Sequence, residues 1–532
     1  MRTRFAIAAI AALGFAAIPG ARHVQSQAAT TAELASLKTR AESSEFKETS
    51  RYDDVVSFMQ AVVKASPKVR LTTFGKTFEG RALPLAVVGA PDPTPAVVRK
   101  TGKLRVYIQG NIHAGEVEGK ESAQMLLRDL AEGKHDDWLQ SMVLLIAPIY
   151  NADGNERIST NNRGRQNGPI AGQGQRPNAQ NYDLNRDHMK LDSPEARAFV
   201  KLMNDYDPQL TMDLHTTDGS VHGYYLTYAP SLNPATDPAI IDFLRKQLLP
   251  SVTKAIKAKY DWDFYYYGNI EGRGDERAWR SFDHRPRFNN NYIGLRNRVA
   301  ILSEAYAYAT FEDRVKATSR FVEEVLTDAN ANAGAIRKVT DAADKTSLIG
   351  SKLALRAELE RAPEPVEILL GEVTEEKNPI SSNLMNRRVD VRKPERMPEY
   401  GTFKATETER VPSGYYLPWA LTDVVDCLHA HGIIMTPVAS RNVQIEEFHI
   451  QTNELAPGEF QGHRERTLTG TWGPAERQLP AGTLRVDMKQ PLARLAFYLL
   501  EPRSDDGLLD WNFLDDVLSG EVKVYPIVRT RN

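Results

Sequence analysis

The sequence contains almost no cysteine and no surplus of charge. Cys427 is the single cysteine among 532 residues, so no intramolecular disulfide can form and the core alone must stabilise the fold. It lies in a helix-like apolar pattern between Leu421 and His431, which is typical of a buried structural thiol rather than a nucleophile. The 67 Lys and Arg residues nearly balance 69 Asp and Glu residues, whereas a general nucleic-acid binder needs a basic surplus. We therefore expect no nucleic-acid partner.

Long apolar runs are also scarce. Phe5 to Ile18 is an apolar run, but it is too short to span a bilayer comfortably. Arg2 and Arg4 precede it and small residues follow it, which predicts a secretory signal peptide over residues 1–28. No later stretch is long and apolar enough for a membrane helix. We expect a secreted or periplasmic protein without a membrane span.

The apolar segments that are present are short and are separated by connections of helix length. Strand-like runs occupy residues 104–109, 142–149, 209–214 and 298–303. This alternation predicts an α/β fold with a mixed central sheet flanked by helices, which we assign to a domain of residues 29–335. A helical pattern continues to about Glu360 and suggests a helical linker over residues 336–365. Short β-like runs in residues 366–532 predict a smaller, β-rich C-terminal domain.

A histidine and a glutamate stand where the first of these apolar runs gives way to a helix-like segment. His113 and Glu116 are three residues apart in Gly110-Asn-Ile-His-Ala-Gly-Glu, so their side chains can share a face. An imidazole and a carboxylate that converge on one point suit Zn²⁺, provided that a third ligand arrives from elsewhere. Alone, the pair fits an ordinary surface loop equally well, because a pair with this spacing also arises by chance.

Three further polar residues are candidates for a site with this pair. Two of them end strand-like runs, and the third lies in the polar segment 182–187. His215 ends the run 209–214 and is a candidate third ligand, which would leave a fourth zinc position for water. Glu304 ends the run 298–303, and a glutamate beside activated water acts as general base and then as general acid. Arg186 carries a guanidinium suited to gripping a carboxylate through two hydrogen bonds.

Together these pieces resemble the zinc carboxypeptidases of the carboxypeptidase A/B type. The matching elements, in chain order, are His113-x-x-Glu116, Asn151-Ala-Asp-Gly154, Asp183-x-Asn185-Arg186, His215 and Glu304. The resemblance extends over about residues 52–311. It implies one Zn²⁺ per chain, with His113, Glu116 and His215 as ligands. It also implies that Asp183 orients a ligand histidine.

The resemblance assigns roles on the substrate side as well. Asn185 and Arg186 would hold the terminal carboxylate of a peptide, and Glu304 would be the general base. The family arginine that polarises the scissile carbonyl has two candidates, Arg163 and Arg165, of which we slightly favour Arg165. The mobile substrate-binding tyrosine of the family has no counterpart in residues 279–285. Either Tyr292 or His284 substitutes for it, or the role is absent from this protein.

These observations predict a secreted or periplasmic zinc metallocarboxypeptidase that hydrolyses C-terminal residues of peptides with a free terminal carboxylate. A zinc amidohydrolase or deacylase acting on small amino-acid conjugates or cell-wall peptides would use the same ligands and is the alternative. A non-catalytic binding protein that kept the fold would lack a ligand or the base, and neither is missing from this sequence.

Overall fold

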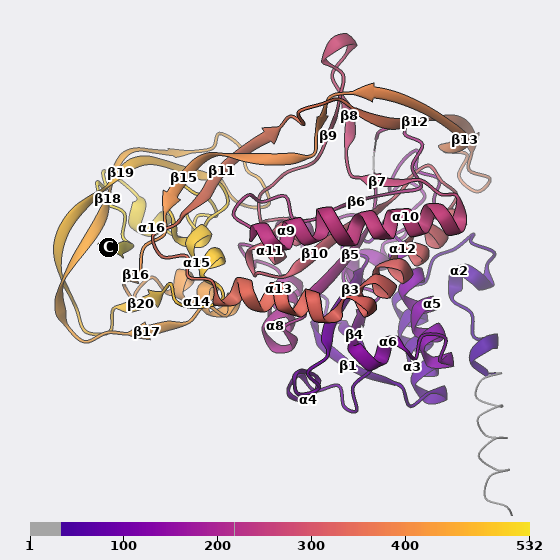
Figure 1. Cartoon of the computed structure of the whole chain (residues 1–532), viewed down its shortest axis with the longest axis horizontal. Coiled ribbons are helices and arrows are strands. Elements are labelled where there is room, and N and C mark those ends of the chain that lie inside the picture. Colours follow the sequence, from indigo (N-terminus) through magenta and orange to yellow (C-terminus); the bar gives the residue numbers. More distant parts are fainter. Residues whose placement is uncertain (1–32, 218, 532) are drawn as a thin grey trace, which may run out of the picture.

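The computed structural model of the chain describes residues 33–217 and 219–531. The predicted signal peptide, residues 1–28, lies outside this range. Among the described residues, none of the helices combines the length and the apolar character that crossing a bilayer requires. Figure 1 shows an α/β part that is built from the first two-thirds of the chain and is joined to a β-rich part at its C-terminal side.

An eight-stranded mixed sheet is the centre of the α/β part. Its strand order is β1-β2-β4-β3-β5-β10-β6-β7. The bounds are β1 Val69–Lys76, β2 Ala82–Val88, β3 Leu104–Gly110, β4 Met142–Ala147, β5 Leu210–Thr216, β6 Leu226–Ala229, β7 Phe264–Tyr266 and β10 Val299–Ala305. The four central strands β4, β3, β5 and β10 run parallel, whereas β2 and β6 are antiparallel to their central neighbours. The predicted mixed sheet is confirmed.

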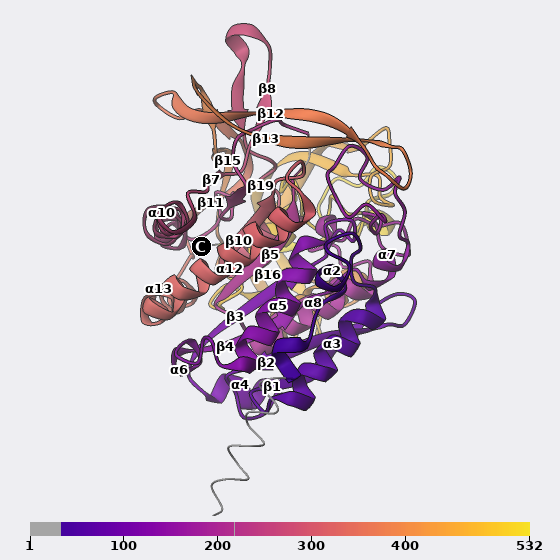
Figure 2. The ribbon, with the colours of Figure 1, turned by 90° about the vertical axis from the view of Figure 1, so that its right-hand side faces the viewer.

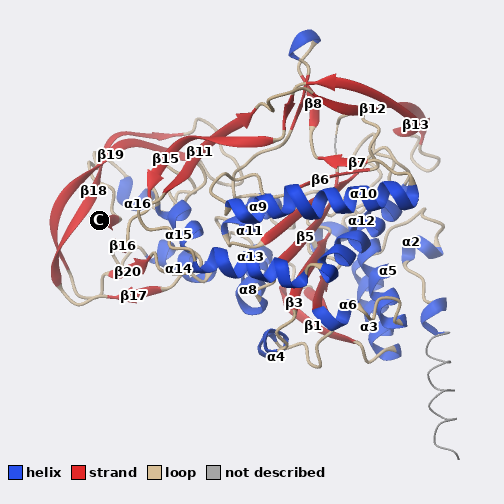
Figure 3. Ribbon diagram, in the orientation of Figure 1, coloured by secondary structure: helices blue, strands red, loops and turns tan. Residues whose placement is uncertain are grey.

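Helices cover both faces of this sheet (Figure 3). Successive side chains of its buried strands point to opposite faces, so both faces are apolar and must be covered. On β3, Val106 and Ile108 join a core that includes apolar residues of α3 (Tyr52–Ala65), α5 (Glu118–Glu132), α10 (Leu249–Tyr260) and α12 (Phe311–Ala331). Tyr107, between them, joins a core on the other face with residues of α8 (Pro194–Tyr206) and α11 (Asn289–Leu295). The flanking helices that the sequence predicts are therefore present.

The second core continues into the C-terminal part, so the two parts share one apolar interior. It includes residues of α14 (Thr422–His431) and α15 (Ala493–Leu500) together with those of α8. These helices pack beside a six-stranded sheet of order β17-β20-β16-β21-β18-β19. Its strands are β16 Gly414–Leu417, β17 Met435–Pro437, β18 Arg441–Leu455, β19 Arg466–Leu479, β20 Leu484–Asp487 and β21 Val528–Thr530. The β-rich C-terminal region is confirmed.

Two long hairpin-like pairs connect this sheet to the α/β part. Strand β11 (Lys352–Glu360) pairs with β15 (Thr402–Arg410), and β12 (Val366–Lys377) pairs with β13 (Leu384–Met397). The β12–β13 hairpin crosses above the α/β part in Figures 1 and 2. A short sheet of β8 (Asn269–Glu271), β9 (Ala278–Arg280) and β14 (Glu399–Tyr400) adds a further connection between the two parts.

The helical pattern predicted through about Glu360 is wrong after residue 345. Helix α13 (Ala333–Lys345) ends there, and β11 begins at Lys352. The segment Lys-Leu-Ala-Leu-Arg-Ala-Glu-Leu-Glu has good helix formers, but β15 lies beside it and supplies the backbone partners of a sheet. Pairing with a distant strand therefore overrides the local helix propensity within the proposed linker 336–365.

Candidate metal centre

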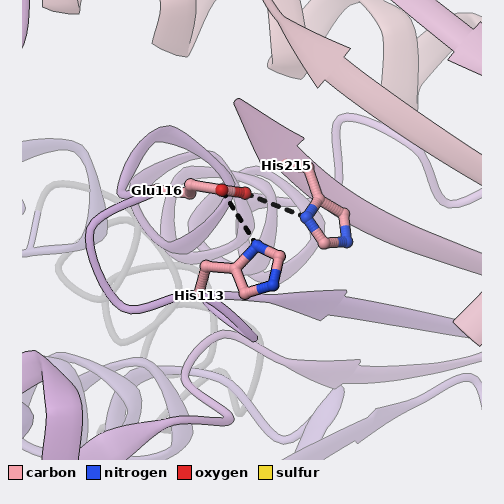
Figure 4. A group of neighbouring side chains, drawn as sticks. All are labelled: His113, Glu116 and His215. Atoms are coloured by element: carbon pink, nitrogen blue, oxygen red, sulfur yellow. Dashed lines mark hydrogen bonds and ion pairs between the residues drawn. The ribbon is translucent and has the colours of Figure 1, made fainter. Parts of the chain in front are cut away.

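The loop between β3 and α5 carries His113 and Glu116, and the adjacent strand β5 carries His215. Strands β3 and β5 are parallel neighbours, with Gly110 opposite Leu214. Parallel strands end at the same edge of a sheet, which is where ligands bind in such folds. The sheet order therefore brings two side chains from the loop and one from a residue about a hundred positions later to one point (Figure 4).

The three side chains present ligand atoms that lie within 4.8 Å of one another. His113 Nδ1 is 2.9 Å from Glu116 Oε1, and His215 Nδ1 is 2.9 Å from Glu116 Oε2. All three side chains are buried. Two imidazole nitrogens and one carboxylate are a donor set that Zn²⁺ accepts at catalytic sites. The residues present fit a zinc ion.

A carboxylate holds the remote nitrogen of each histidine. His113 Nε2 is 3.0 Å from Asp183 Oδ1, and His215 Nε2 is 2.8 Å from Asp213 Oδ2. Such contacts fix the ring orientation and leave Nδ1 as the ligand atom. Asp183 lies where the sequence placed it, but Asp213 was not identified. Its position two residues before His215 could have identified it, because residues two apart on a strand face the same side.

The protonation equilibria reflect this network. Burial favours the neutral form of Glu116, but the charges of His113 and Arg163 outweigh it and hold the Glu116 pKa well below its ordinary value. Burial likewise opposes ionisation of Asp183, and His113 and Arg176 overcome it, so that this pKa is also well below the ordinary value. Both carboxylates are therefore charged at neutral pH, as a metal site requires.

A pocket of about 220 Å³ opens beside the three side chains. Its lining includes Asn185, Arg186 and Glu304 in addition to the cluster. Glu304, near the end of β10, is directly opposite His215 in the parallel register of β10 and β5. The Arg186 guanidinium lies over the Phe288 ring at 3.8 Å. The structure thus brings together the residues that the sequence placed at the metal, at the base position and at the carboxylate position.

The two candidate arginines are separated by the structure. Arg163 lines the pocket, and its guanidinium is 2.8 Å from Glu116 Oε1. Arg165, the favoured candidate, lies outside the pocket, and its half-exposed side chain pairs with Glu375. The structure therefore places Arg163 in the pocket and the favoured Arg165 outside it, and both residues have a left-handed backbone across this turn, with φ of +57° and +67°.

Tyr292 is not at the pocket either. It is fully buried in α11, where its hydroxyl is 2.8 Å from His431 Nδ1. His284 is 3.0 Å from Asp505 and is not among the pocket residues. Among the described residues, the tyrosine that lines the pocket is Tyr267. Tyr267 is the last of three consecutive tyrosines, and the sequence does not show which of the three lines a pocket and which pack in the core.

Sequence reasoning also missed Arg176. This residue lines the pocket, with its guanidinium 2.8 Å from Asp183 Oδ2 and 3.7 Å from Glu116 Oε1. It stands alone in a segment rich in Gln, Asn and Gly, and no motif distinguishes it there. The pocket therefore has three guanidinium groups, those of Arg163, Arg176 and Arg186, which suits an anionic ligand.

Comparisons with known proteins find similar sequences and structures. Residues 55–284 match the family model described as zinc carboxypeptidase. Carboxypeptidase 2 of Trichophyton tonsurans is 25% identical over 483 residues, which cover 85% of this chain and 81% of that protein. Carboxypeptidase D of Rattus norvegicus is 29% identical over 195 residues, 31% of this chain and 14% of that protein. A metallo-carboxypeptidase from Burkholderia cenocepacia superposes with a TM-score of 0.40 at 18% identity, covering 54% of this chain and 71% of the other.

The family match and the sequence relatives are all zinc carboxypeptidases or proteins named carboxypeptidase, a class of metallopeptidases. Over residues 55–284 the chain is therefore similar to the zinc carboxypeptidase family.

Proposed function

We propose that this protein is a zinc-dependent metallocarboxypeptidase that removes C-terminal residues from peptides and holds one Zn²⁺ per chain. The observation that carries the proposal is that Asn185 and Arg186, the predicted carboxylate-binding pair, line the same small pocket as the His-Glu-His cluster. A pocket that grips a terminal carboxylate beside the reacting centre restricts the cut to the last peptide bond. The predicted signal peptide would export the enzyme.

His113, Glu116 and His215 would hold the ion, and Asp183 and Asp213 would keep the two imidazoles in place. When bound, Zn²⁺ supplies a Lewis acid that activates water and polarises a carbonyl. Arg186 donates its hydrogen bonds to the substrate carboxylate, and its stacking on Phe288 restricts the guanidinium to one plane. The last residue of the peptide is thereby oriented before any bond breaks.

Glu304 moves the proton. It faces the same pocket as His215, with which it is in register across β10 and β5. Its carboxylate takes a proton from the attacking water and then delivers that proton to the leaving amine. Arg163 and Arg176 direct positive charge into the pocket and stabilise the oxygen on which negative charge develops.

The test combines metal content with hydrolysis of dipeptides. Wild-type protein should contain about one zinc per chain and should cleave dipeptides that have a free C-terminal carboxylate, but not the same dipeptides after amidation. His215→Ala should lose both zinc and activity, because two ligands bind the ion weakly. His429→Ala, at an exposed histidine of α14, is the matched control and should retain both.

Two outcomes would contradict the proposal. Equal cleavage of free and amidated dipeptides would show that Asn185 and Arg186 do not bind a terminal carboxylate. That result would favour the alternative function, a zinc amidohydrolase. A wild-type protein without zinc that also fails to take up added zinc would remove the metal chemistry altogether.

A further inference from the structure

The two residues that the proposed function assigns to the substrate carboxylate both rest on one short segment, residues 287–289. The Arg186 guanidinium lies over the Phe288 ring at 3.8 Å. The backbone amide of Asn289, at the start of α11, donates to Asn185 Oδ1 at 2.8 Å. Phe288 lines the metal pocket, and Asn289 is buried. The position of this segment therefore sets the positions of both side chains in the pocket.

A buried carboxylate of the C-terminal part holds this segment. Asp506 accepts hydrogen bonds from the backbone amide of Arg287 and from its Nε atom, the second at 2.8 Å. Both side chains are buried. Burial raises the pKa of Asp506 to about 6, so the carboxylate is charged at neutral pH and forms an ion pair with the guanidinium. Because Asp506 binds both the main chain and the side chain of Arg287, it fixes the backbone directly before Phe288.

Two further C-terminal residues complete the contact with Arg287. Glu465 Oε1 accepts a hydrogen bond from Arg287 Nη2 at 2.8 Å. The guanidinium also lies over the Trp511 ring at 4.5 Å, and Trp511 Nε1 donates to Asp506 Oδ1 at 2.9 Å. A buried guanidinium is costly unless it is paired and hydrogen-bonded. These partners, which all come from the C-terminal part, therefore keep Arg287 in one place.

The C-terminal part also reaches the chain segment that carries Asn185 and Arg186. Gln461 Oε1 accepts a hydrogen bond from the backbone amide of Asp183 at 2.8 Å. Gln461 has a φ value of +52°, in the left-handed region that non-glycine residues rarely adopt. Such a conformation persists when the surroundings over-determine it. The pocket residues are thus held by the C-terminal part through their own segment as well as through segment 287–289.

Joining the two parts of the chain does not by itself account for the Asp506 contact. Arg494 of α15 pairs with Asp237 at 2.7 Å and donates to Asn297 Oδ1 at 3.0 Å, and the two parts share an apolar core. These contacts attach the C-terminal part without Asp506. The Asp506 contact differs from them because its partner, Arg287, directly precedes a residue that lines the metal pocket.

We propose that Asp506 is a positioning residue for the substrate carboxylate. It acts through Arg287, which fixes the segment 287–289 that supports Arg186 and Asn185. The inference rests on the proposed carboxypeptidase function and gives the C-terminal part a role in substrate binding. Asp506 is not among the residues that line the pocket, so it acts without touching the substrate. An arginine binds a carboxylate through two parallel hydrogen bonds only when its plane is aligned with that carboxylate, so a displaced support weakens the contact.

The experiment measures kcat and KM separately for a dipeptide with a free C-terminal carboxylate, in the wild type and in Asp506→Asn. Asparagine keeps the shape of the side chain and removes its charge. KM should rise by about tenfold, the effect of weakening one hydrogen bond to a charged group. The value of kcat and the zinc content should stay at the wild-type level, because this contact is made equally in the ground state and the transition state. Asp516→Asn, at an exposed position of α16 (Asp515–Leu518), is the matched control and should keep the wild-type KM.

A purely structural role for Asp506 predicts a different result. If Asp506→Asn only destabilised the fold, fewer molecules would be active, so kcat per chain and the thermal unfolding midpoint would fall. The KM of the molecules that remain folded would not change.

A second pair of variants decides the question if Asp506→Asn does not fold. Glu465→Gln weakens a contact with the same guanidinium from a side chain that is 30% exposed, so its replacement disturbs the core less. It should raise KM by about threefold, the effect of weakening one hydrogen bond. Glu459→Gln, at an exposed position of the same loop between β18 and β19, should leave KM unchanged.

The outcomes separate the two proposals. A wild-type KM in a folded Asp506→Asn, or in Glu465→Gln where Asp506→Asn does not fold, would overturn the positioning role and leave the carboxypeptidase function intact. A lower kcat and a lower unfolding midpoint with an unchanged KM would also overturn it, because Asp506 would then act on the fold alone. A wild type that cleaves no dipeptide would instead remove the proposed function on which the positioning role rests.

Discussion

Replacing Asp213 by asparagine tests whether the buried carboxylate behind His215 contributes to metal binding. Asp213 Oδ2 is 2.8 Å from His215 Nε2, while Oδ1 accepts a hydrogen bond from Gln109 Nε2 at 3.1 Å. Asparagine has nearly the same shape, so the variant keeps the packing of β5 and removes one negative charge. Burial disfavours the charged form of His215, but Asp213 and Glu116 outweigh it and raise the His215 pKa well above its ordinary value.

The magnitude follows from the role of such carboxylates in metal sites. Removing one typically weakens metal binding by about 10- to 100-fold, which corresponds to about 1.4 to 2.8 kcal/mol of binding free energy. Because Asp213 is buried, solvent and salt screen its interaction with the imidazole much less than they would at the surface. We expect the zinc affinity of Asp213→Asn to fall by about 10- to 100-fold, although all three ligands remain.

The assay is competition for Zn²⁺ against a chelator of known affinity, with the thermal unfolding midpoint of the metal-free protein measured in parallel. Asp205→Asn is the matched control, since Asp205 pairs with Lys201 at the surface of α8 and should leave zinc affinity unchanged. A zinc affinity for Asp213→Asn equal to that of the wild type would refute the reasoning. A large fall in the unfolding midpoint of the metal-free variant would show instead that the charge acts on the fold.

Three further predictions concern the base, the arginines and a buried carboxyl group. Glu304→Gln should lower kcat for a dipeptide by about 10²- to 10⁴-fold while elemental analysis finds its zinc content unchanged. Arg163→Met should lower kcat/KM by about 10²-fold or more, whereas Arg165→Met, outside the pocket, should have a far smaller effect on the same dipeptide. Burial raises the pKa of Glu501 from 4.5 to about 7, so the folded state holds this proton more tightly than the unfolded state does. Its contribution to stability is therefore full below pH 4.5 and is lost as the pH rises to about 7, a change on the order of 3 kcal/mol. Urea unfolding at several pH values should show this slope for the wild type and a flatter one for Glu501→Gln.

Much of the α/β part could be predicted because its signals are local. The apolar runs that became β3, β4, β5 and β10 mark buried parallel strands, and such strands read as nearly continuous hydrophobic segments. His215 and Glu304 stand at the ends of two of these runs, where ligands bind in α/β sheets. The spacing of His113 and Glu116 is likewise a short-range feature.

The failures share a different cause. Residues 352–360 form a strand because β15 lies beside them, and nothing within the segment records that partner. Arg163 and Arg165 have the same side chain and differ by two positions, so their sequence environment could not separate them. Their separation comes from a turn that β12 and β13 hold from the other end of the chain.

The sequence by itself therefore determined the ligand types, the strand ends that carry them and the exclusion of disulfides from the fold. Only the tertiary structure decided which arginines reach the pocket, that Asp213 supports His215, and that Asp506 of the C-terminal part pairs with Arg287. Hydrophobic periodicity and short spacings are properties of neighbouring residues, whereas strand order and loop direction depend on contacts between segments hundreds of residues apart.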